Sequence, residues 1–343
     1  MLYPILVGAK NVMDYRAKFF ARSLILIFIF RIIQTLAQHN HVEDSYPRHF
    51  SMHKETGDEM SQSYIVDKAK QRKKAAHFRS LHGSQHILVL PNAWDAASAK
   101  MFERAGFGAV ATTSAGIANA YGYPDGEQMS RDEMLEAVGR IAKAVALPVT
   151  ADMEAGFGNT PDEVAETARL VLESDAIGLN LEDGTQDKLH PLSDISLQVE
   201  KIKAVRETAN SFGVPLVTNA RTDVYEKFDK NDKSLLSQAI QRGNAYREAG
   251  ADCVFVINMD DEKIIGDLVR EINAPINVLA RYGSPTISEL EKLGVARVSF
   301  GSIPMRATMS LVGRIAEEIK QNGTYNFARD ILTYAEANSY FER

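Results

Sequence analysis

Two acidic residues stand at alternate positions near the end of an apolar run, in residues 148–159 (PVTADMEAGFGN). Val149 and Thr150 predict a buried strand, and Asp152 and Glu154 follow just before a glycine turn. Because side chains two apart on a strand share a face, we expect both carboxylates to point the same way. Converging carboxylates repel each other unless a cation lies between them, and oxygen ligands suit Mg²⁺ or Mn²⁺. The segment therefore predicts a metal site.

Other predicted strands also end in polar side chains that could bind an anion. Glu182 and Arg221 end two later apolar runs, and a guanidinium presents a fork of N–H donors that fits a carboxylate or phosphonate. The small residues Ser114, Ala115 and Gly116 offer a hydroxyl and backbone N–H groups to a second anionic group. Together with a metal, this set suits a small di-acid or oxo-acid. Chelated Mg²⁺ would stabilise the enolate left when a neighbouring bond breaks.

Short apolar runs alternate with amphipathic stretches of helical length, which is the βα pattern of a parallel sheet. We expect strands at residues 87–91, 109–114, 148–154, 176–182, 216–222, 253–258, 275–280 and 297–302. Helices are predicted to start near Ser130, Thr160 and Ser288. Eight such units fit the α/β fold called a (β/α)8 barrel, with its site at the C-terminal strand ends. A doubly wound open sheet is the alternative, although no GxGxxG follows the first strand.

The composition is that of an ordinary globular protein, for which an enzyme that acts on a small molecule is the default expectation. The 343 residues are 45% hydrophobic and 24% charged, and the net charge is -6. This negative charge, without any nucleic-acid-binding motif, argues against a nucleic-acid partner. The single cysteine, Cys253, excludes a disulfide within the chain and a zinc cysteine cluster. Because Cys253 lies in an apolar run, we interpret it as a small buried hydrophobe.

Residues 1–60 differ from the rest, and we predict that they form an extension outside the fold. The apolar run at 23–30 (SLILIFIF) is shorter than the roughly 20 residues of a membrane span. Its basic, apolar and polar order also fits a signal or targeting leader, and a membrane anchor is a third interpretation. We expect a barrel domain over 61–323 and a C-terminal helical tail over 324–343. The expected location is cytoplasmic with no membrane partner, and leader-directed export or organelle import remain alternatives.

From residue 85 to about residue 323, the chain resembles the isocitrate lyase/phosphoenolpyruvate mutase superfamily. The matching motifs occur in order: PNAWDAASA, TTSAG, YGYPDG, ADMEAGFGN, NLEDG, NARTD, PINVLA and GVARVSFGS. The superfamily includes 2-methylisocitrate lyase, phosphonopyruvate hydrolase and an oxaloacetate decarboxylase branch. The resemblance implies a (β/α)8 barrel and a homotetramer with the last helix exchanged between subunits. It also implies Mg²⁺-dependent cleavage or rearrangement of a 2-oxo or 2-hydroxy acid through an enolate-like state.

The same resemblance implies roles for the residues that match the family motifs. The predicted metal ligands are Asp125, Asp152, Glu154 and Glu182. The predicted substrate-binding residues are Ser114, Ala115, Gly116, Arg221 and Asn277, and Arg221 also counts as catalytic.

The segment after Glu182 departs from the family pattern. The lyases carry a catalytic cysteine here in Lys-Lys-Cys-Gly-His or Lys-Arg-Cys-Gly-His, whereas residues 184–193 read GTQDKLHPLS. The asparagine of the mutase branch's Lys-Thr-Asn is also missing, and Asn180 replaces a histidine of the lyases. Lys188 and His190 on this loop are candidates for supplying a proton to the enolate, although loop residues of these types are often only solvated.

These departures favour one function and leave two others open. The favoured function is a Mg²⁺-dependent (or Mn²⁺-dependent) lyase that cleaves a C–C bond of a small 2-oxo or 2-hydroxy carboxylic acid, in the manner of an oxaloacetate decarboxylase. One alternative is a P–C bond hydrolase or mutase that acts on phosphonopyruvate-type substrates. The other is a barrel that binds a metabolite without turning it over.

Overall fold

The computed structural model describes residues 67–342 of the chain. The predicted extension at 1–60, with its apolar run, lies outside the described residues. None of the helices within 67–342 combines the length and the apolar character needed to cross a membrane.

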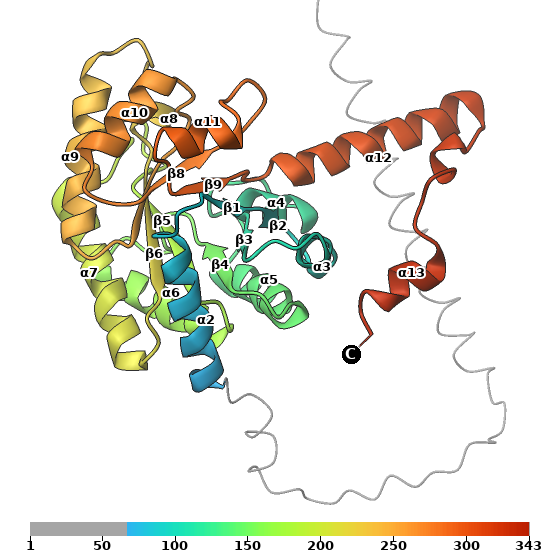
Figure 1. The fold of residues 1–343 in the computed structure, drawn as a ribbon, viewed down its shortest axis with the longest axis horizontal. Coiled ribbons are helices and arrows are strands. Elements are labelled where there is room, and N and C mark those ends of the chain that lie inside the picture. Colours follow the sequence, from blue (N-terminus) through green and yellow to red (C-terminus); the bar gives the residue numbers. More distant parts are fainter. Residues whose placement is uncertain (1–66, 343) are drawn as a thin grey trace, which may run out of the picture. The chain divides into compact units, whose positions relative to one another are not determined.

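The described strands are all parallel and form one sheet that closes into a barrel (Figure 1). In chain order they are β1 (Leu88–Leu90), β2 (Asn92–Ala93), β3 (Val110–Thr112), β4 (Val149–Asp152), β5 (Gly178–Glu182), β6 (Val217–Thr222), β7 (Cys253–Val256), β8 (Ile276–Leu279) and β9 (Arg297–Ser299). β1 pairs with β9 and β2 pairs with β3, so the two pieces of the first strand close the sheet. Pro91, which lacks an N–H, separates these two pieces. The predicted barrel is confirmed, with its first strand divided.

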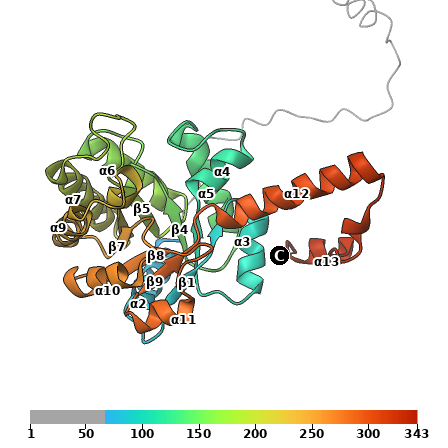
Figure 2. The ribbon, with the colours of Figure 1, turned by 90° about the horizontal axis from the view of Figure 1, so that it is seen from above.

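Helices surround the strands (Figures 1 and 2). They are α2 (Lys68–Leu81), α3 (Ala96–Arg104), α4 (Ser114–Ala120), α5 (Arg131–Ala144), α6 (Pro161–Glu173), α7 (Ile195–Phe212), α8 (Val224–Lys227), α9 (Ser234–Glu248), α10 (Glu262–Glu271), α11 (Ile287–Lys292), α12 (Ile303–Asn322) and α13 (Tyr334–Ser339). Ser130 and Thr160 cap α5 and α6, as predicted. The prediction of a helix that starts near Ser288 is also confirmed, since α11 begins at Ile287, and Thr286 caps it through a capping box with Glu289.

Several of the predicted strands extend too far at their C-terminal ends, and two of them, 109–114 and 148–154, affect the site. β4 ends at Asp152, and Glu154 has a left-handed backbone with φ of 50°. The prediction that these two acids share one strand face was therefore wrong. β3 ends at Thr112, and Thr113 caps a helix that begins at Ser114. In both places the chain turns while its residues are still buried, so apolar patterning does not show where the strand ends.

The barrel core holds Cys253 as a buried side chain of β7, which confirms its interpretation as a small hydrophobe. Burial raises the pKa of its thiol to about 12, so the thiol stays protonated and unreactive at neutral pH.

Helix α12 extends away from the barrel, and the short helix α13 follows it near the C-terminus (Figures 1 and 2). Within the described part of α12, Met305 is the one buried residue. Met309, Leu311, Val312 and Ile319 are exposed. Helix α12 thus presents apolar side chains that the described chain leaves uncovered.

His82 ends α2 and is buried beside Phe78. Its Nδ1 atom lies 3.0 Å from the Phe78 carbonyl, and the two rings meet edge to face. Burial, with the nearby positive charge of Arg297, lowers the pKa of His82 to about 4. The folded protein therefore keeps His82 neutral at a pH where an unfolded chain protonates it.

We expect this shift to make the protein less stable in mild acid. As the pH falls from 7 to 5, unfolded His82 takes up a proton that folded His82 does not, and the free energy of unfolding drops by about 2 kcal/mol. Urea unfolding of a His82→Gln variant should show a weaker dependence on pH over this range. His77→Gln, which changes an exposed histidine of the same helix, is the matched control. Equal pH slopes for wild type and His82→Gln would contradict the assignment.

Candidate active site

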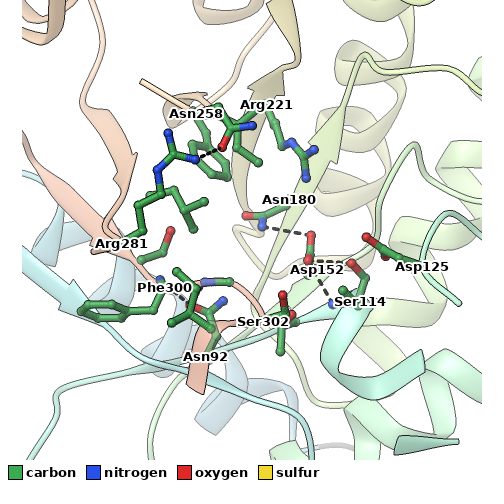
Figure 3. Close-up of a pocket in the computed structure, with 18 of the residues that line it drawn as sticks. Asn92, Ser114, Asp125, Asp152, Asn180, Arg221, Asn258, Arg281, Phe300 and Ser302 are labelled. Carbon is green, nitrogen blue, oxygen red and sulfur yellow. Dashed lines mark hydrogen bonds between the residues drawn. The ribbon is translucent and has the colours of Figure 1, made fainter. Parts of the chain in front are cut away.

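A cavity of about 310 Å³ opens at the C-terminal ends of the strands, where a barrel of this kind carries its site (Figure 3). Its lining is mostly polar and comes from most of the strand ends. The predicted site residues that line it are Ser114, Ala115, Asp125, Asp152 and Arg221.

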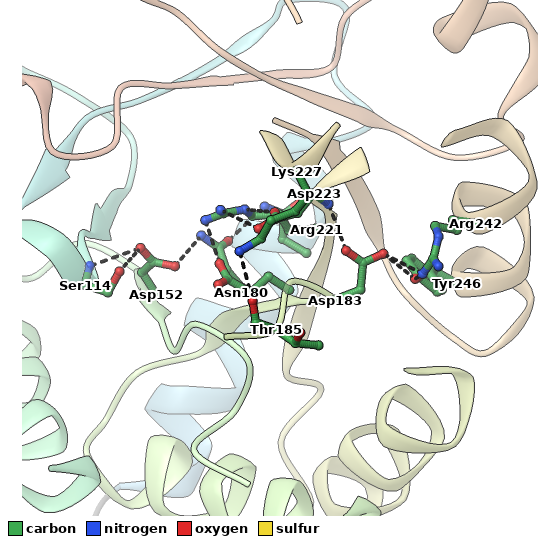
Figure 4. A network of polar contacts seen from close by, with 12 residues as sticks. Ser114, Asp152, Asn180, Asp183, Thr185, Arg221, Asp223, Lys227, Arg242 and Tyr246 are labelled. Carbon is green, nitrogen blue, oxygen red and sulfur yellow. Dashed lines mark hydrogen bonds and ion pairs between the residues drawn. The ribbon is translucent and has the colours of Figure 1, made fainter. Parts of the chain in front are cut away.

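Asp152 is held on both sides by hydrogen bonds (Figures 3 and 4). Its Oδ2 accepts from the Ser114 backbone N–H at 3.0 Å and from the Ser114 hydroxyl at 2.9 Å. Its Oδ1 accepts from the Asn180 amide at 3.1 Å, and the two residues are paired across β4 and β5. The Asn180 Oδ1 in turn accepts from Asn219 at 2.8 Å, which fixes the orientation of the Asn180 amide. Asp152 therefore presents a carboxylate of defined orientation to the cavity.

Asp125 and Glu154 lie close enough to Asp152 for their charges to interact. Burial, and then the charges of Asp152 and Asp125, raise the pKa of Glu154 to about 8. Burial and the charge of Asp152 also raise the pKa of Asp125. Glu154 is 5% exposed, and its Oε2 accepts from the Glu127 backbone N–H at 2.8 Å. This corner of the site therefore favours a positive charge.

Arg221 lines the cavity between two carboxylates (Figure 4). Its Nη1 lies 2.6 Å from Glu182 Oε2, and its Nε and Nη2 bind the two oxygens of Asp223 at 2.6 and 3.1 Å. Although burial disfavours its charge, Glu182 and Asp223 raise the pKa of Arg221. Of its five N–H donors, two remain for a ligand. Arg221 is thus a fixed cation with spare donors.

Asp183 ties the ends of β5 and β6 to helix α9 (Figure 4). Its fully buried carboxylate accepts from the Tyr246 hydroxyl at 2.6 Å, from Arg242 Nη1 at 3.0 Å and from the Asp223 backbone N–H at 2.8 Å. Because the Asp223 side chain binds Arg221, this network helps to fix the position of the Arg221 guanidinium.

Two predicted substrate-binding residues lie outside the cavity lining. Gly116 is buried in α4, where an added Cβ would approach the Thr113 side chain to 2.5 Å. Asn277 is fully buried inside the barrel and donates to Ser299 Oγ at 3.1 Å. In the described structure, both residues serve packing and the interior of the barrel.

The loop at 184–193 folds back on itself beside the site. Gly184 and Leu192 form an antiparallel bridge, and Lys227 Nζ donates to the Thr185 carbonyl at 3.0 Å. Lys188 and His190 are exposed and do not line the cavity.

The donor set fits a hard divalent cation even though no metal cluster is preformed. Within residues 67–342, no three acids, histidines or cysteines are grouped as metal ligands. Mg²⁺, however, commonly binds through one or two carboxylates and completes its shell with water and substrate oxygens. Asp152 and Asp125 provide two such carboxylates at the cavity. The other two predicted ligands, Glu154 and Glu182, do not line the cavity. Glu154 accepts from the Glu127 backbone N–H, and Glu182 pairs with Arg221.

Several cavity residues were missed from the sequence. They are Asn258, Arg281, Ser302 and Arg306. A signal existed for Arg281, because a charged residue directly follows the apolar run PINVLA. Arg306 lies inside α12, where nothing in the sequence distinguishes it from a surface arginine.

Comparison with known proteins places the chain among enzymes of one superfamily. The family model described as phosphoenolpyruvate phosphomutase matches residues 78–320. An uncharacterized protein of Mycobacterium tuberculosis is 35% identical over 242 residues, which are 71% of this chain and 88% of that protein. The 2-methylisocitrate lyase of Bacillus subtilis is 29% identical over 273 residues, which are 76% of this chain and 87% of the lyase.

Solved structures share the fold. A Burkholderia cenocepacia J2315 protein has a TM-score of 0.75 at 36% identity and covers 80% of this chain and 98% of its own. Phosphonopyruvate hydrolase, solved with oxalate and Mg²⁺, has a TM-score of 0.70 at 24% identity and covers 78% of this chain and 94% of its own. At that identity, the hydrolase supports the fold alone.

We expect the Tyr246 hydroxyl to stabilise the support behind Arg221. Tyr246→Phe leaves the buried Asp183 carboxylate with one donor fewer, which should lower the free energy of unfolding by about 1–3 kcal/mol. Urea unfolding measures this change. Tyr282→Phe, which alters a fully exposed tyrosine, is the matched control and should change stability by less than about 0.5 kcal/mol. Equal effects of the two substitutions would show that the Asp183 network contributes no net stability.

Proposed function

Since this chain belongs to the phosphoenolpyruvate phosphomutase family, within the isocitrate lyase/phosphoenolpyruvate mutase superfamily, we propose that it is a Mg²⁺-dependent carbon–carbon lyase. Its substrate would be a small 2-oxo or 2-hydroxy carboxylic acid. The observation that carries the proposal is the oriented Asp152 carboxylate, which faces the same cavity as Asp125 and Arg221.

The proposed chemistry divides between the cation and the residues around it. A divalent ion held by Asp152 and Asp125 would supply positive charge to the enolate oxygen. The two remaining donors of Arg221 would orient the substrate carboxylate. Ser114 and Asn180 would keep Asp152 in place, and Ala115 would border the bound acid. When the C–C bond breaks, its electron pair stays with the enolate fragment, which then takes up a proton.

The loop at 184–193 supports a decarboxylase-like reaction over the usual lyase reaction. Without the lyase cysteine, this segment lacks the family's acid for the cleaved fragment. Loss of CO2 needs only enolate stabilisation and a later proton. Lys188 and His190 are the proposed proton donors, and this role requires the loop to move over the cavity. A P–C bond reaction on phosphonopyruvate is the second candidate, since Arg221 fits a phosphonate as well as a carboxylate.

The first test is turnover by purified protein. With Mg²⁺, we expect release of a pyruvate-like product from oxaloacetate, 2-methylisocitrate or a related acid, and loss of activity in EDTA. Asp152→Asn should lower kcat at least about a hundredfold, because it weakens the oriented anionic site. Asp162→Asn, an exposed change on α6, is the control.

The outcomes separate the alternatives. Phosphate released from phosphonopyruvate would favour P–C chemistry. Binding of these acids without any turnover, in wild type and Asp152→Asn alike, would favour a metabolite-binding barrel.

We also propose that the chain forms a homotetramer in which α12 packs against another subunit. The exposed apolar side chains of α12 support this proposal, since such side chains are usually covered. Val312→Glu should shift the sedimentation coefficient towards a smaller species, whereas Gln321→Glu on the same helix should not. A monomeric wild-type protein would contradict the proposal.

A further inference from the structure

We propose that Arg281 is a specificity-determining residue that binds the second, distal carboxylate of a dicarboxylic substrate. The inference rests on the proposed function, because it assumes that the 2-oxo or 2-hydroxy end of the substrate binds near Asp152. Figure 3 shows Arg281 across the cavity from Asp152, Ser114 and Asp125. A ligand that reaches from one side to the other would therefore meet a carboxylate-binding group at each end.

The Arg281 guanidinium is held rigidly at the cavity. Its Nε donates to Asp260 Oδ2 at 3.0 Å, and its Nη2 forms an ion pair with the same oxygen. Its Nη1 donates to Asn258 Oδ1 at 2.9 Å (Figure 3). Three of the five N–H donors are thus used, and two remain for a carboxylate. The side chain is 33% exposed, so a ligand in the cavity can reach it.

The backbone around Asn258 supports this arrangement. Asn258 has a φ of 60°, a left-handed conformation that asparagine tolerates better than most residues. The Asn258 side chain accepts from Arg281, and its carbonyl accepts from Lys230 Nζ at 2.8 Å. Residues held in sparsely populated conformations cluster at ligand-binding sites. Such a support reduces the entropy that Arg281 would lose on binding a ligand.

The charges that line the cavity favour a ligand with more than one anionic group. Once a divalent ion balances Asp152 and Asp125, the remaining charged lining residues are Arg221, Glu226, Arg281 and Arg306. Arg221 already pairs with Glu182 and Asp223, so what these arginines offer a ligand is their unused N–H donors. Asp260 compensates Arg281 in the free protein and holds its guanidinium from the side, which leaves part of the donor set to a substrate. A monocarboxylate would engage the unused donors of only one of the two arginines, Arg221 or Arg281.

The alternative is a purely structural role, in which Arg281 only connects two loops through its hydrogen bonds to Asp260 and Asn258. The two roles predict different results for ligands of different reach. Oxalate is short and mimics the metal-binding end of a 2-oxo acid, whereas malate adds a distal carboxylate beyond a 2-hydroxy acid end. A specificity role affects malate alone, and a purely structural role affects both ligands through the shape of the site.

The test is isothermal titration calorimetry of the full chain with oxalate and with malate, each in the presence of Mg²⁺. We expect Arg281→Gln to weaken malate binding at least tenfold and to change oxalate binding less than twofold, with an unchanged melting temperature. Arg281→Lys should restore part of the malate affinity. Arg270→Gln, which alters an exposed arginine of α10, is the matched control and should affect neither ligand.

One further variant removes an ambiguity. Arg281→Gln leaves the Asp260 carboxylate unpaired, and this negative charge could itself repel malate. In the double variant Arg281→Gln with Asp260→Asn, both charges are gone. Malate binding should stay weak if Arg281 binds the distal carboxylate, and should recover if Asp260 alone caused the loss.

The inference is overturned if wild type fails to bind malate, if oxalate and malate weaken equally, or if neither weakens. It is also overturned if malate binding recovers in the double variant. Failure of the proposed lyase activity is a separate result, because calorimetry needs no turnover. Selective loss of malate binding in a protein with no lyase activity would support the role of Arg281 and contradict the proposed function.

Discussion

The balance of charge at the strand ends is the constraint on which the rest of the site depends. Parallel strands bring their C-terminal ends to one rim, and here several of them carry acids. These acids are Asp152, Glu182 and Asp223, with Asp125 and Glu154 in the adjoining loops. Burial makes each negative charge costly unless a cation or N–H donors compensate it. Arg221 compensates the acids on one side by ion pairs, whereas within residues 67–342 neither Asp125 nor Asp152 forms an ion pair.

This division explains why the two halves of the site differ. On the Arg221 side, the ion pairs with Glu182 and Asp223 are complete, and the Asp183 network braces them against α9. On the other side, hydrogen bonds from Ser114 and Asn180 orient Asp152, but such donors do not supply a full charge. The raised pKa values of Asp125 and Glu154 express the same imbalance. A divalent ion bound beside Asp125 and Asp152 would supply the missing positive charge.

The sequence predicted the barrel well because alternating apolar runs and helical stretches are a direct consequence of burying parallel strands between helices. It also placed Asp125, Asp152 and Arg221 at one cavity, through motif resemblance and the rule that barrel strands end at the site. It did not predict the turn after Asp152. The left-handed Glu154 breaks the two-residue periodicity that the prediction assumed. Asn277, too, was placed at a strand end, although it points into the buried interior.

The position of Arg281 after an apolar run could be noticed in the sequence, but the ligand-binding role proposed for it could not, for a physical reason. A guanidinium becomes a ligand-binding group when partners far along the chain fix its plane, and here Asn258 and Asp260 come from a different βα unit. No local pattern records that contact. Asp152 and Arg221 have a local signature because they lie on strands, whereas the role of Arg281 depends on contacts with a separate loop. In a fold that many enzymes share, the loops select the substrate, and loop sequences show the least regular hydrophobic pattern. The reaction type is therefore easier to predict from the sequence than the substrate.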